Sequence, residues 1–261
     1  MAGLFGSLKT AAEKRQQFRA DLESGTITRL PGAFNPLTAR LIQDIGGFGG
    51  VYVSGAVLAN DLGLPDIGLT TLTEVAQRSG QIVRATDLPV LVDADTGFGE
   101  PMSAARTIAA LEDAGLAGCH LEDQVNPKRC GHLDGKEVVD KDIMVRRISA
   151  AVNELRDPNF IICARTDAAG VNGKTELLSA QQLEDLGYNA VIWPVSSFRV
   201  AMGATEDFLR DLQETGIQTD WLERMQHRSR LYELVRYEEY NDFDKSVFTY
   251  SKDTYQPTFE S

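Results

Sequence analysis

The amino-acid sequence predicts an α/β fold of the (β/α)8 TIM-barrel type. Short apolar runs alternate with amphipathic stretches of helical length between residues 26 and 196. Parallel strands need crossover connections of this kind, so the alternation favours a parallel sheet with helices packed outside it. Three apolar runs also close on charged residues, at Asp93, Glu122 and Arg165. Because a barrel builds its active site from the C-terminal ends of its strands, we expect these side chains to meet in one pocket.

The predicted elements follow one another along residues 1–261, which we treat as a single domain. An N-terminal appendage, residues 1–25, contains an exposed helix over residues 11–24, because charge is mixed there with spaced apolar residues. Strands are expected within residues 26–34, 50–55, 88–95, 117–124, 159–167 and 189–196. Helices are expected over residues 36–45, 72–85, 102–114, 141–155 and 179–186, and residues 200–261 form a C-terminal helical extension.

Composition excludes several classes of function. Of the 261 residues, 43% are hydrophobic and 25% are charged, which is close to the average for soluble globular proteins. The net charge of −12 repels phosphate backbones and anionic lipid surfaces, so neither nucleic acid nor a membrane is an expected partner. No segment approaches the ~20 apolar residues that span a bilayer. Three cysteines without a C-x-x-C pair favour a reducing compartment, and we expect a cytoplasmic protein.

Three carboxylates at strand ends predict a metal site. Asp93 and Asp95 are two residues apart, so at a strand end both side chains could point into one pocket, and Glu122 follows on the next strand. No cation is obvious among them in the sequence. Hard oxygen ligands suit Mg²⁺, which keeps several waters and accepts substrate oxygens. The alternative interpretation is a set of helix caps or surface acids.

The stretch KRCGH, Lys128 to His132, predicts a reactive cysteine. Cys130 follows two basic residues and precedes a histidine by two positions, and positive charge nearby lowers the pKa of a thiol. The alternative is a small buried residue that happens to lie near basic ones. Cys119 and Cys163 lie inside apolar runs, so we expect them to be packing residues.

Two arginines and a histidine are further candidates. Arg165 ends a strand with apolar residues behind it, and a guanidinium there can hold a substrate carboxylate in bidentate fashion. Arg199, after the last strand, could act in the same way, although each alone is more often a surface or structural arginine. His120 shares a strand face with Glu122, so it either supports a metal site from outside or is a hydrogen-bonded core residue.

Six motifs carry a resemblance to a known family. YVSG, LGLPDIG, VDADTGFG, HLEDQ, KRCGH and ARTD stand in this order and near the family's spacings. The chain thereby resembles the isocitrate lyase and phosphoenolpyruvate mutase superfamily, and most closely its methylisocitrate lyases. The match runs from about Gly25 to Asp167 and resumes from about Lys174 to Tyr250. The resemblance implies a Mg²⁺-dependent retro-aldol cleavage of 2-methylisocitrate to pyruvate and succinate, in the methylcitrate cycle of propionate breakdown.

The resemblance also implies roles for individual residues. The metal-binding positions of the family fall on Asp93, Asp95 and Glu122. Cys130 matches the catalytic acid, and the resemblance extends the catalytic set to its neighbours Lys128 and His132 and to Arg165. The substrate-binding positions fall on Ser54, Gly55, Ala56, Asp66, Cys130, Gly131, Arg165, Arg199 and Arg228. Cysteine at position 130 favours the lyase branch, because superfamily members with phosphonate chemistry usually lack it.

The chain departs from the family between Ala168 and Leu178. A barrel unit of strand and helix takes roughly 30 residues, and the stretch from Phe160 to Asn189 holds about one such unit where about three are expected. About two βα units are therefore missing, and six parallel strands remain. Either the chain is internally shortened or the sequence omits a segment.

Three functional hypotheses follow from the sequence. The first is the methylisocitrate lyase reaction on a small tricarboxylate. The second is another superfamily lyase or hydrolase acting on a 2-oxo or 2-hydroxy dicarboxylate. The third is a shortened homologue that binds Mg²⁺ or a dicarboxylate without turnover. By resemblance the protein is a homotetramer that exchanges C-terminal helices, for which residues 200–250 supply an aromatic and aliphatic surface.

Overall fold

The computed structural model of the chain describes residues 6–129, 137–168 and 177–248. Its strands are β1 (Thr28–Pro31), β2 (Val51–Val53), β3 (Val90–Asp93), β4 (Gly118–Glu122), β5 (Ile161–Arg165) and β6 (Ala190–Trp193). Its helices are α1 (Ala11–Glu23), α2 (Pro36–Ile45), α3 (Gly55–Asp61), α4 (Leu72–Ala85), α5 (Pro101–Asp113), α6 (Lys141–Asn153), α7 (Ala180–Asp185), α8 (Ser196–Thr215), α9 (Arg228–Leu234) and α10 (Tyr237–Phe248). No helix in these ranges is long and apolar enough to cross a membrane.

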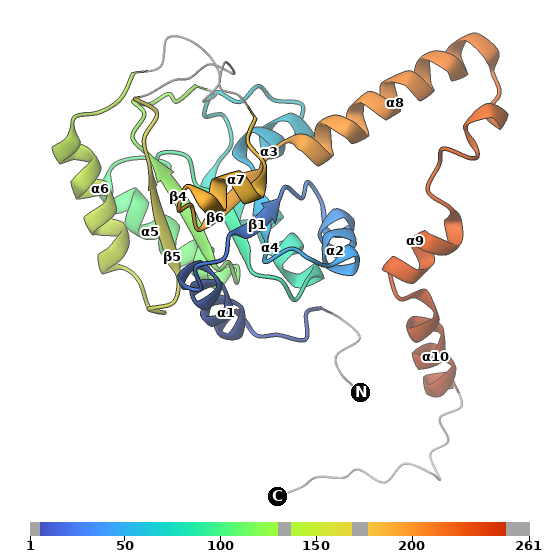
Figure 1. Cartoon of the computed structure of the whole chain (residues 1–261), viewed down its shortest axis with the longest axis horizontal. Helices are drawn as coiled ribbons and strands as arrows, with labels where there is room; N and C mark the ends of the chain where they lie inside the picture. The colour runs from blue at the N-terminus through green and yellow to red at the C-terminus, as the bar shows by residue number, and fades with distance from the viewer. Residues whose placement is uncertain (1–5, 130–136, 169–176, 249–261) are drawn as a thin grey trace, which may run out of the picture.

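The strands form an incomplete parallel barrel (Figure 1). Strands β2, β3, β4 and β5 pair in that order, β1 pairs with β6, and every pairing is parallel. An isolated parallel bridge between Gly32 and Tyr52 joins the two sheets. The order is therefore β6-β1-β2-β3-β4-β5, and no described strand connects β5 to β6. We call this gap between β5 and β6 the seam.

The predicted alternation of strands and crossover helices is confirmed. Helix α2 has the predicted bounds because Asn35 caps its start, Pro36 occupies its first turn, and Gly46 ends it at a φ of +75°. Helix α4 also has the predicted bounds, since Thr71 and Glu74 form a capping box. Helix α3 was not predicted, because it has only seven residues and begins directly at the YVSG motif.

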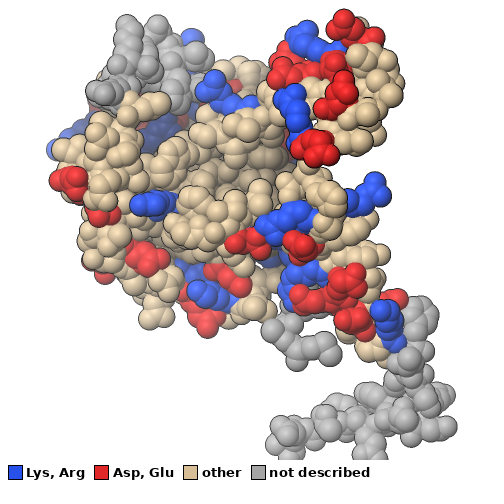
Figure 2. All heavy atoms as spheres, turned by 45° about the vertical axis from the view of Figure 1, so that its right-hand side comes forward, with Lys and Arg blue, Asp and Glu red and all other residues tan. Residues whose placement is uncertain are grey.

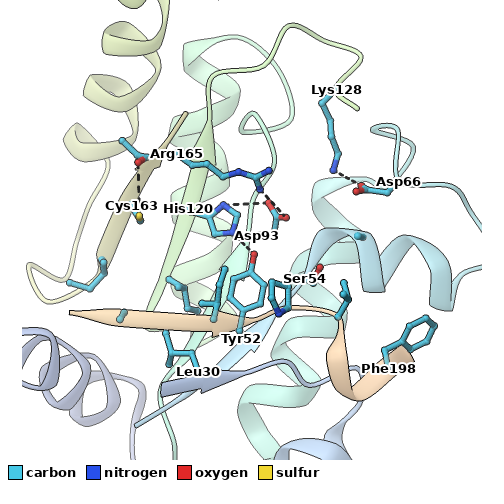
Figure 3. A pocket seen from close by; sticks show the side chains of 18 of the residues that line it. Leu30, Tyr52, Ser54, Asp66, Asp93, His120, Lys128, Cys163, Arg165 and Phe198 are labelled. Atoms are coloured by element: carbon cyan, nitrogen blue, oxygen red, sulfur yellow. Dashed lines mark hydrogen bonds and ion pairs between the residues drawn. The ribbon is translucent and has the colours of Figure 1, made fainter. Parts of the chain in front are cut away.

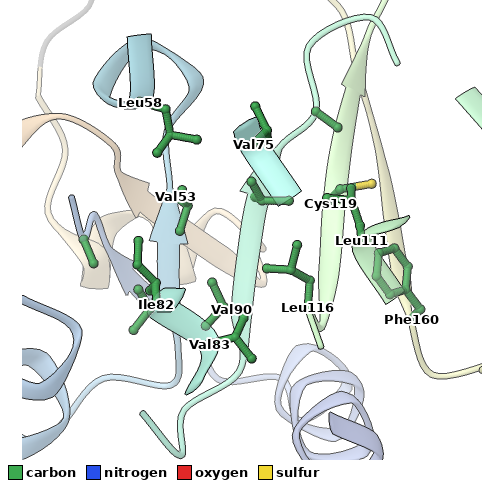
Figure 4. Packing of buried hydrophobic residues seen from close by; sticks show 14 of the residues in the cluster. Val53, Leu58, Val75, Ile82, Val83, Val90, Leu111, Leu116, Cys119 and Phe160 are labelled. Atoms are coloured by element: carbon green, nitrogen blue, oxygen red, sulfur yellow. The ribbon is translucent and has the colours of Figure 1, made fainter. Parts of the chain in front are cut away.

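The hydrophobic core lies between strands β2 to β4 and the helices that cover them (Figure 4). These three strands are buried at every position. Cys119 on β4 belongs to this core, as predicted for a packing residue. Burial of each such side chain contributes about 1.5–3 kcal/mol to the free energy of folding. This half of the barrel therefore holds the C-terminal ends of β2 to β4 in place.

The N-terminal helix α1 is not the exposed appendage that the sequence predicted. Phe18 is buried, and so are the side chains of Lys14 and Arg15. The Lys14 ammonium donates hydrogen bonds to the backbone carbonyls of Val83 and Thr86, at 2.9 and 2.6 Å. These basic side chains can be buried because backbone carbonyls at the ends of neighbouring elements accept hydrogen bonds from them. The charge pattern alone was misleading.

Cys163 on β5 is not the packing residue that the sequence predicted. Its apolar run is typical of a strand with neighbours on both sides, yet Cys163 and Ala164 are exposed. The reason is the seam, which leaves β5 without a second neighbour.

The C-terminal helices extend away from the barrel, as Figure 1 shows for α8. Helix α8 exposes Val200, Met202 and Leu209. Helix α9 returns to the body of the protein, where the Arg40 guanidinium donates to the Leu234 carbonyl at 3.1 Å. In Figure 2 acidic and basic side chains lie next to one another along this C-terminal arm. We define the C-terminal arm as α8, α9 and α10.

Candidate active site

The candidate active site is a cavity of about 920 Å³ inside the barrel, reached by the C-terminal ends of the strands (Figure 3). Its polar lining comes from strands β2 to β6 and from the segments that follow them. These polar residues are Tyr52, Ser54, Asn60, Asp66, Asp93, His120, Lys128, Arg165 and Arg199. The structure thus brings together most of the described side chains that the sequence singled out, as convergence of parallel strand ends predicts.

Asp93 and Asp95 lie next to each other, but the prediction that both point into one pocket was wrong, because Asp93 lines the cavity whereas Asp95 and Glu122 do not. Asp93 ends β3, and Asp95 adopts a φ of +47°, which turns the chain so that its amide donates to the Asp93 Oδ1 at 3.0 Å. Both side chains are buried. A Cβ at Gly55 would stand only 3.1 Å from Asp93 Oδ2 and from Asp95 Oδ1. Glycine at position 55 therefore leaves room for the carboxylate pair.

Lys128 neutralises one side of the carboxylate pair. Its ammonium lies 2.8 Å from Asp95 Oδ1 and also forms an ion pair with Asp66. Although burial opposes the positive charge, the carboxylates of Asp95, Asp93 and Asp66 raise the pKa of Lys128 above its usual value. Lys128 is therefore a fixed cation, and its ion pairs tie the segment before Cys130 to Asp66 and Asp95.

Arg165 neutralises the other side. Its guanidinium lies 3.1 Å from Glu122 Oε2, 3.0 Å from Asp167 Oδ1 and 3.8 Å from Asp93 Oδ2. The sequence analysis found no cation among the three carboxylates, and this was wrong, because Arg165 and Lys128 reach them from other strand ends. Arg165 is held by carboxylates on three sides, so a substrate carboxylate would have to share it.

Tyr52 and His120 form a buried pair next to Asp93. The Tyr52 hydroxyl is hydrogen-bonded to His120 Nε2, and His120 Nδ1 lies 3.6 Å from Asp93 Oδ1. Burial raises the pKa of Tyr52 well above its usual value and lowers that of His120. Both open interpretations of His120 therefore hold in part, since it is buried and it also contacts the carboxylate pair. Tyr52 was missed, although it lies two residues before Ser54 and so on the same strand face.

Gln124 is a second residue that the sequence analysis missed. Its side-chain amide donates to Asp167 Oδ2 at 2.7 Å and to the Arg129 carbonyl at 2.9 Å, and its Oε1 accepts from the Arg129 amide at 2.8 Å. The side chain is 1% exposed. Gln124 thus fixes the start of the loop that carries Cys130. The signal was its place in the HLEDQ motif, at the end of a predicted strand region.

The three buried carboxyl groups differ in the direction of their pKa shifts. Burial raises the pKa of Asp95 to about 7 and that of Glu122 to about 9, and the charge on Asp93 adds to both effects. Burial also opposes ionisation of Asp93, but the basic groups of His120 and Lys128 hold the pKa of its carboxyl below its usual range. Two of the three carboxyls therefore hold protons readily unless a further cation is present.

The carboxylates fit a Mg²⁺ ion. Glu122 Oε1 is buried and has no hydrogen-bond partner among the residues that the structure describes. The atoms that could bind a metal ion here are all carboxylate oxygens, which Mg²⁺ prefers. No group of three ligands in the described ranges is already gathered around one point. Mg²⁺ needs no such cage, because it keeps several waters and takes one or two carboxylates. Asp93 and Asp95 would hold the ion, with Glu122 behind them.

Other predicted site residues lie in several places. Ser54 and Ala56 line the cavity at the start of α3, and Arg199 lines it from the first turn of α8 with its side chain exposed. Arg228 begins α9 and is not part of the cavity lining. Cys130, Gly131 and His132 lie outside the described residues.

The chain is similar to proteins of known name. A family model described as phosphoenolpyruvate phosphomutase matches residues 18–177. A probable 2-methylisocitrate lyase of Corynebacterium glutamicum is 61% identical, in an alignment that covers 99% of this chain and 100% of that protein. A second probable 2-methylisocitrate lyase of that organism is 58% identical over 95% of this chain and 98% of its own. The crystal structure of a 2,3-dimethylmalate lyase matches with a TM-score of 0.81 at 26% identity, covering 95% of this chain and 99% of that one.

The alignment also measures the shortening. It spans 308 positions with the first of these relatives, whereas this chain has 261 residues, so at least 47 positions, the difference, have no residue here. That number corresponds to between one and two strand–helix units. Among the described residues, only α7 stands between β5 and β6, and β6 pairs with β1 as the last strand of a closed barrel does. The relative's extra length and the seam therefore agree with the predicted shortening.

Proposed function

The chain belongs to the phosphoenolpyruvate mutase and isocitrate lyase superfamily, and on this basis we propose that it is a Mg²⁺-dependent lyase that cleaves 2-methylisocitrate into pyruvate and succinate. The observation that carries the proposal is the buried set of Asp93, Asp95 and Glu122 between the two cations Lys128 and Arg165. The identity to relatives named 2-methylisocitrate lyase supports the choice of substrate.

The chemistry requires one carbon–carbon bond to break. The substrate hydroxyl gives its proton to a carboxylate of the site or to water, its carbon becomes the carbonyl of pyruvate, and the bonding electron pair moves onto the carbon that becomes part of succinate. Bound Mg²⁺ would supply Lewis acidity for the substrate oxygens. The protein must then stabilise a succinate enediolate and return a proton to carbon.

Residues of this chain perform the remaining tasks in the proposal. Arg165, at the edge of the cavity, offsets charge on the enediolate. The Ser54 hydroxyl and the backbone at Gly55 hold a substrate carboxylate at the start of α3, next to Asp93, whose Oδ2 accepts from the Gly55 amide at 3.4 Å. The Cys130 thiol gives its proton to carbon and becomes a thiolate, which the basic residues beside it stabilise. Lys128 and Gln124 hold the residues directly before Cys130 in place, through Asp95 and the Arg129 carbonyl.

The test of the proposed substrate is a panel of acids with the full chain and Mg²⁺. We expect pyruvate and succinate from 2-methylisocitrate, and much slower turnover of isocitrate, 2,3-dimethylmalate and oxaloacetate. Faster cleavage of 2,3-dimethylmalate would favour the second hypothesis, a lyase that acts on a 2-hydroxy dicarboxylate. Saturable Mg²⁺ binding without turnover of any acid would support the non-catalytic homologue.

Cys130→Ser tests the proposed acid separately from binding. Because serine is a far weaker acid, we expect turnover to fall by about 10²-fold or more while the affinity for succinate stays within about threefold. Cys119→Ser, in the core of β4, is the matched control. Retained turnover in Cys130→Ser would remove Cys130 from this role.

We further propose the cellular setting that the resemblance implies. The reaction belongs to the methylcitrate cycle of propionate breakdown, in the cytoplasm. The C-terminal arm supports a homotetramer, because α8 exposes Val200, Met202 and Leu209 away from the barrel and these side chains would be buried against a neighbouring subunit. Substituting all three by serine is expected to reduce the mass measured by light scattering, and an unchanged mass would count against this assembly.

A further inference from the structure

The seam exposes the backbone of two strands. The Ile161 amide donates to Ala117 on the side of β4, and the Asn189 carbonyl accepts from Thr28 on the side of β1. Because alternate residues of a parallel strand turn their backbone groups to opposite edges, the intervening residues face the seam. The seam-facing residues are Ile162 and Ala164 on β5 and Ala190 and Ile192 on β6. No strand in the described part of the chain pairs with either edge.

Neither edge carries the protection that natural edge strands have. Solvent-facing edges are usually blunted by charged side chains, proline or bulges. Strand β6 reads Ala-Val-Ile-Trp, and β5 has only its final residue, Arg165, charged. Both sequences are typical of strands with a neighbour on each side. Cys163 and Ile192 nevertheless line the cavity and are exposed, Ile192 at 38%. These edges are therefore built to be paired.

Among the described residues, α7 is the one element between β5 and β6, so no described residue supplies a further strand for the seam. A parallel neighbour for both edges can come from another chain.

A second copy of this chain presents the complementary edges. The strand order ends in an unpaired edge on β5 and an unpaired edge on β6. Because all strand pairings are parallel, β5 and β6 run in the same direction. Rotation of a copy by a half turn about an axis along the strands places its β6 beside β5 and its β5 beside β6. The contact is then reciprocal and closes with two subunits.

We propose that a second copy of the chain closes the seam, with β5 of each copy pairing in parallel with β6 of the other. The cavity that holds the candidate active site opens through the same seam, so the partner copy also completes its wall. This interface is distinct from an assembly through the C-terminal arm, and it holds whether or not the proposed reaction is correct.

Disulfide formation across the seam tests the proposal. Cys163 and Ile192 both line the cavity and so lie on the inner faces of their strands. Ile192→Cys, in a Cys130→Ser background, is therefore expected to give a disulfide-linked dimer on oxidation. Ala190→Cys is the second variant, since it lies on the same face one pairing step away. Both variants are run on non-reducing gels after circular dichroism has shown that they fold.

Two control variants make the expected cross-link specific. Val191→Cys is not part of the cavity lining and points to the opposite face, so it should give at least about tenfold less dimer. Adding Cys163→Ser to Ile192→Cys should abolish the dimer. An intrachain disulfide, seen as a monomer of altered mobility, would show that the barrel closes on itself and would overturn the proposal. Absence of interchain disulfide from both folded variants would overturn it as well.

Discussion

Strands β3 and β4 and strands β5 and β6 have similar sequences and very different surroundings. Val92 on β3 and Leu121 on β4 are completely buried, whereas Ile192 on β6 is 38% exposed. All are apolar residues in short parallel strands. The difference is the number of neighbours, because β3 and β4 are each flanked by two strands and β5 and β6 by one. Burial in this barrel is thus set by the adjoining strand rather than by the strand's own composition.

The candidate active site follows the same division. Its carboxylates Asp93, Asp95 and Glu122 belong to the ends of β3 and β4, in the fully paired half. Arg165 ends β5, at the seam. The metal-binding part of the proposed site is therefore on the complete part of the barrel, and the part that faces the substrate anion is at its open edge.

The largest expected effect comes from a change in the complete half. Asp95→Asn keeps the size of the side chain but removes a metal-binding charge, so we expect the rate of pyruvate formation to fall by about 10³-fold or more. Cys163→Ser, at the seam, should change the rate by less than about threefold. Similar losses in both variants would contradict the division of the site, and steady-state assays at saturating Mg²⁺ make the comparison.

Core truncation should also separate the two regions. Leu121→Ala leaves a cavity beside the sheet and is expected to lower the free energy of unfolding by about 3 kcal/mol. Ile192→Ala, at a partly exposed position, should cost less than about 1 kcal/mol when measured in dilute protein. Urea denaturation gives both values. Equal costs in dilute protein would contradict the difference in burial between β4 and β6.

A smaller effect concerns Lys14 on helix α1, which packs against the fully paired half of the barrel. Burial lowers the pKa of Lys14 to about 8 in the folded chain, against 10.5 for the unperturbed group. The unfolded chain therefore binds this proton more tightly, and stability should rise as the pH increases from about 8 towards 10.5. Relative to Lys14→Met, the native chain should gain about 2 kcal/mol between pH 7 and 9.5.

The control for this pH effect is the exposed Lys9. Lys9→Met should show the same pH dependence as the native chain in urea denaturation at the two pH values. If Lys14→Met and the native chain change in parallel, then the two backbone carbonyls that accept from Lys14 keep its ammonium charged in the folded protein.

The sequence was sufficient for the fold class, the order of elements and the strand ends that carry Asp93, Asp95 and Glu122. These follow from local patterns, since apolar runs, caps and the position of a charge after a strand are all visible in the chain. It was not sufficient for the pairing of Lys128 with Asp66 or of Arg165 with Glu122, because these contacts join elements far apart in the sequence. It also failed for Cys163 and Lys14, whose exposure depends on whether another element packs against them.

Metal-dependent release of pyruvate from 2-methylisocitrate tests most directly whether the complete half of the barrel carries a working site. The full chain is assayed with Mg²⁺, then with excess chelator, and then with Mg²⁺ restored, and Asp95→Asn serves as the inactive control. We expect pyruvate release that stops with the chelator and returns with Mg²⁺. No release from a folded chain, or release that the chelator leaves unchanged, would contradict the proposed function.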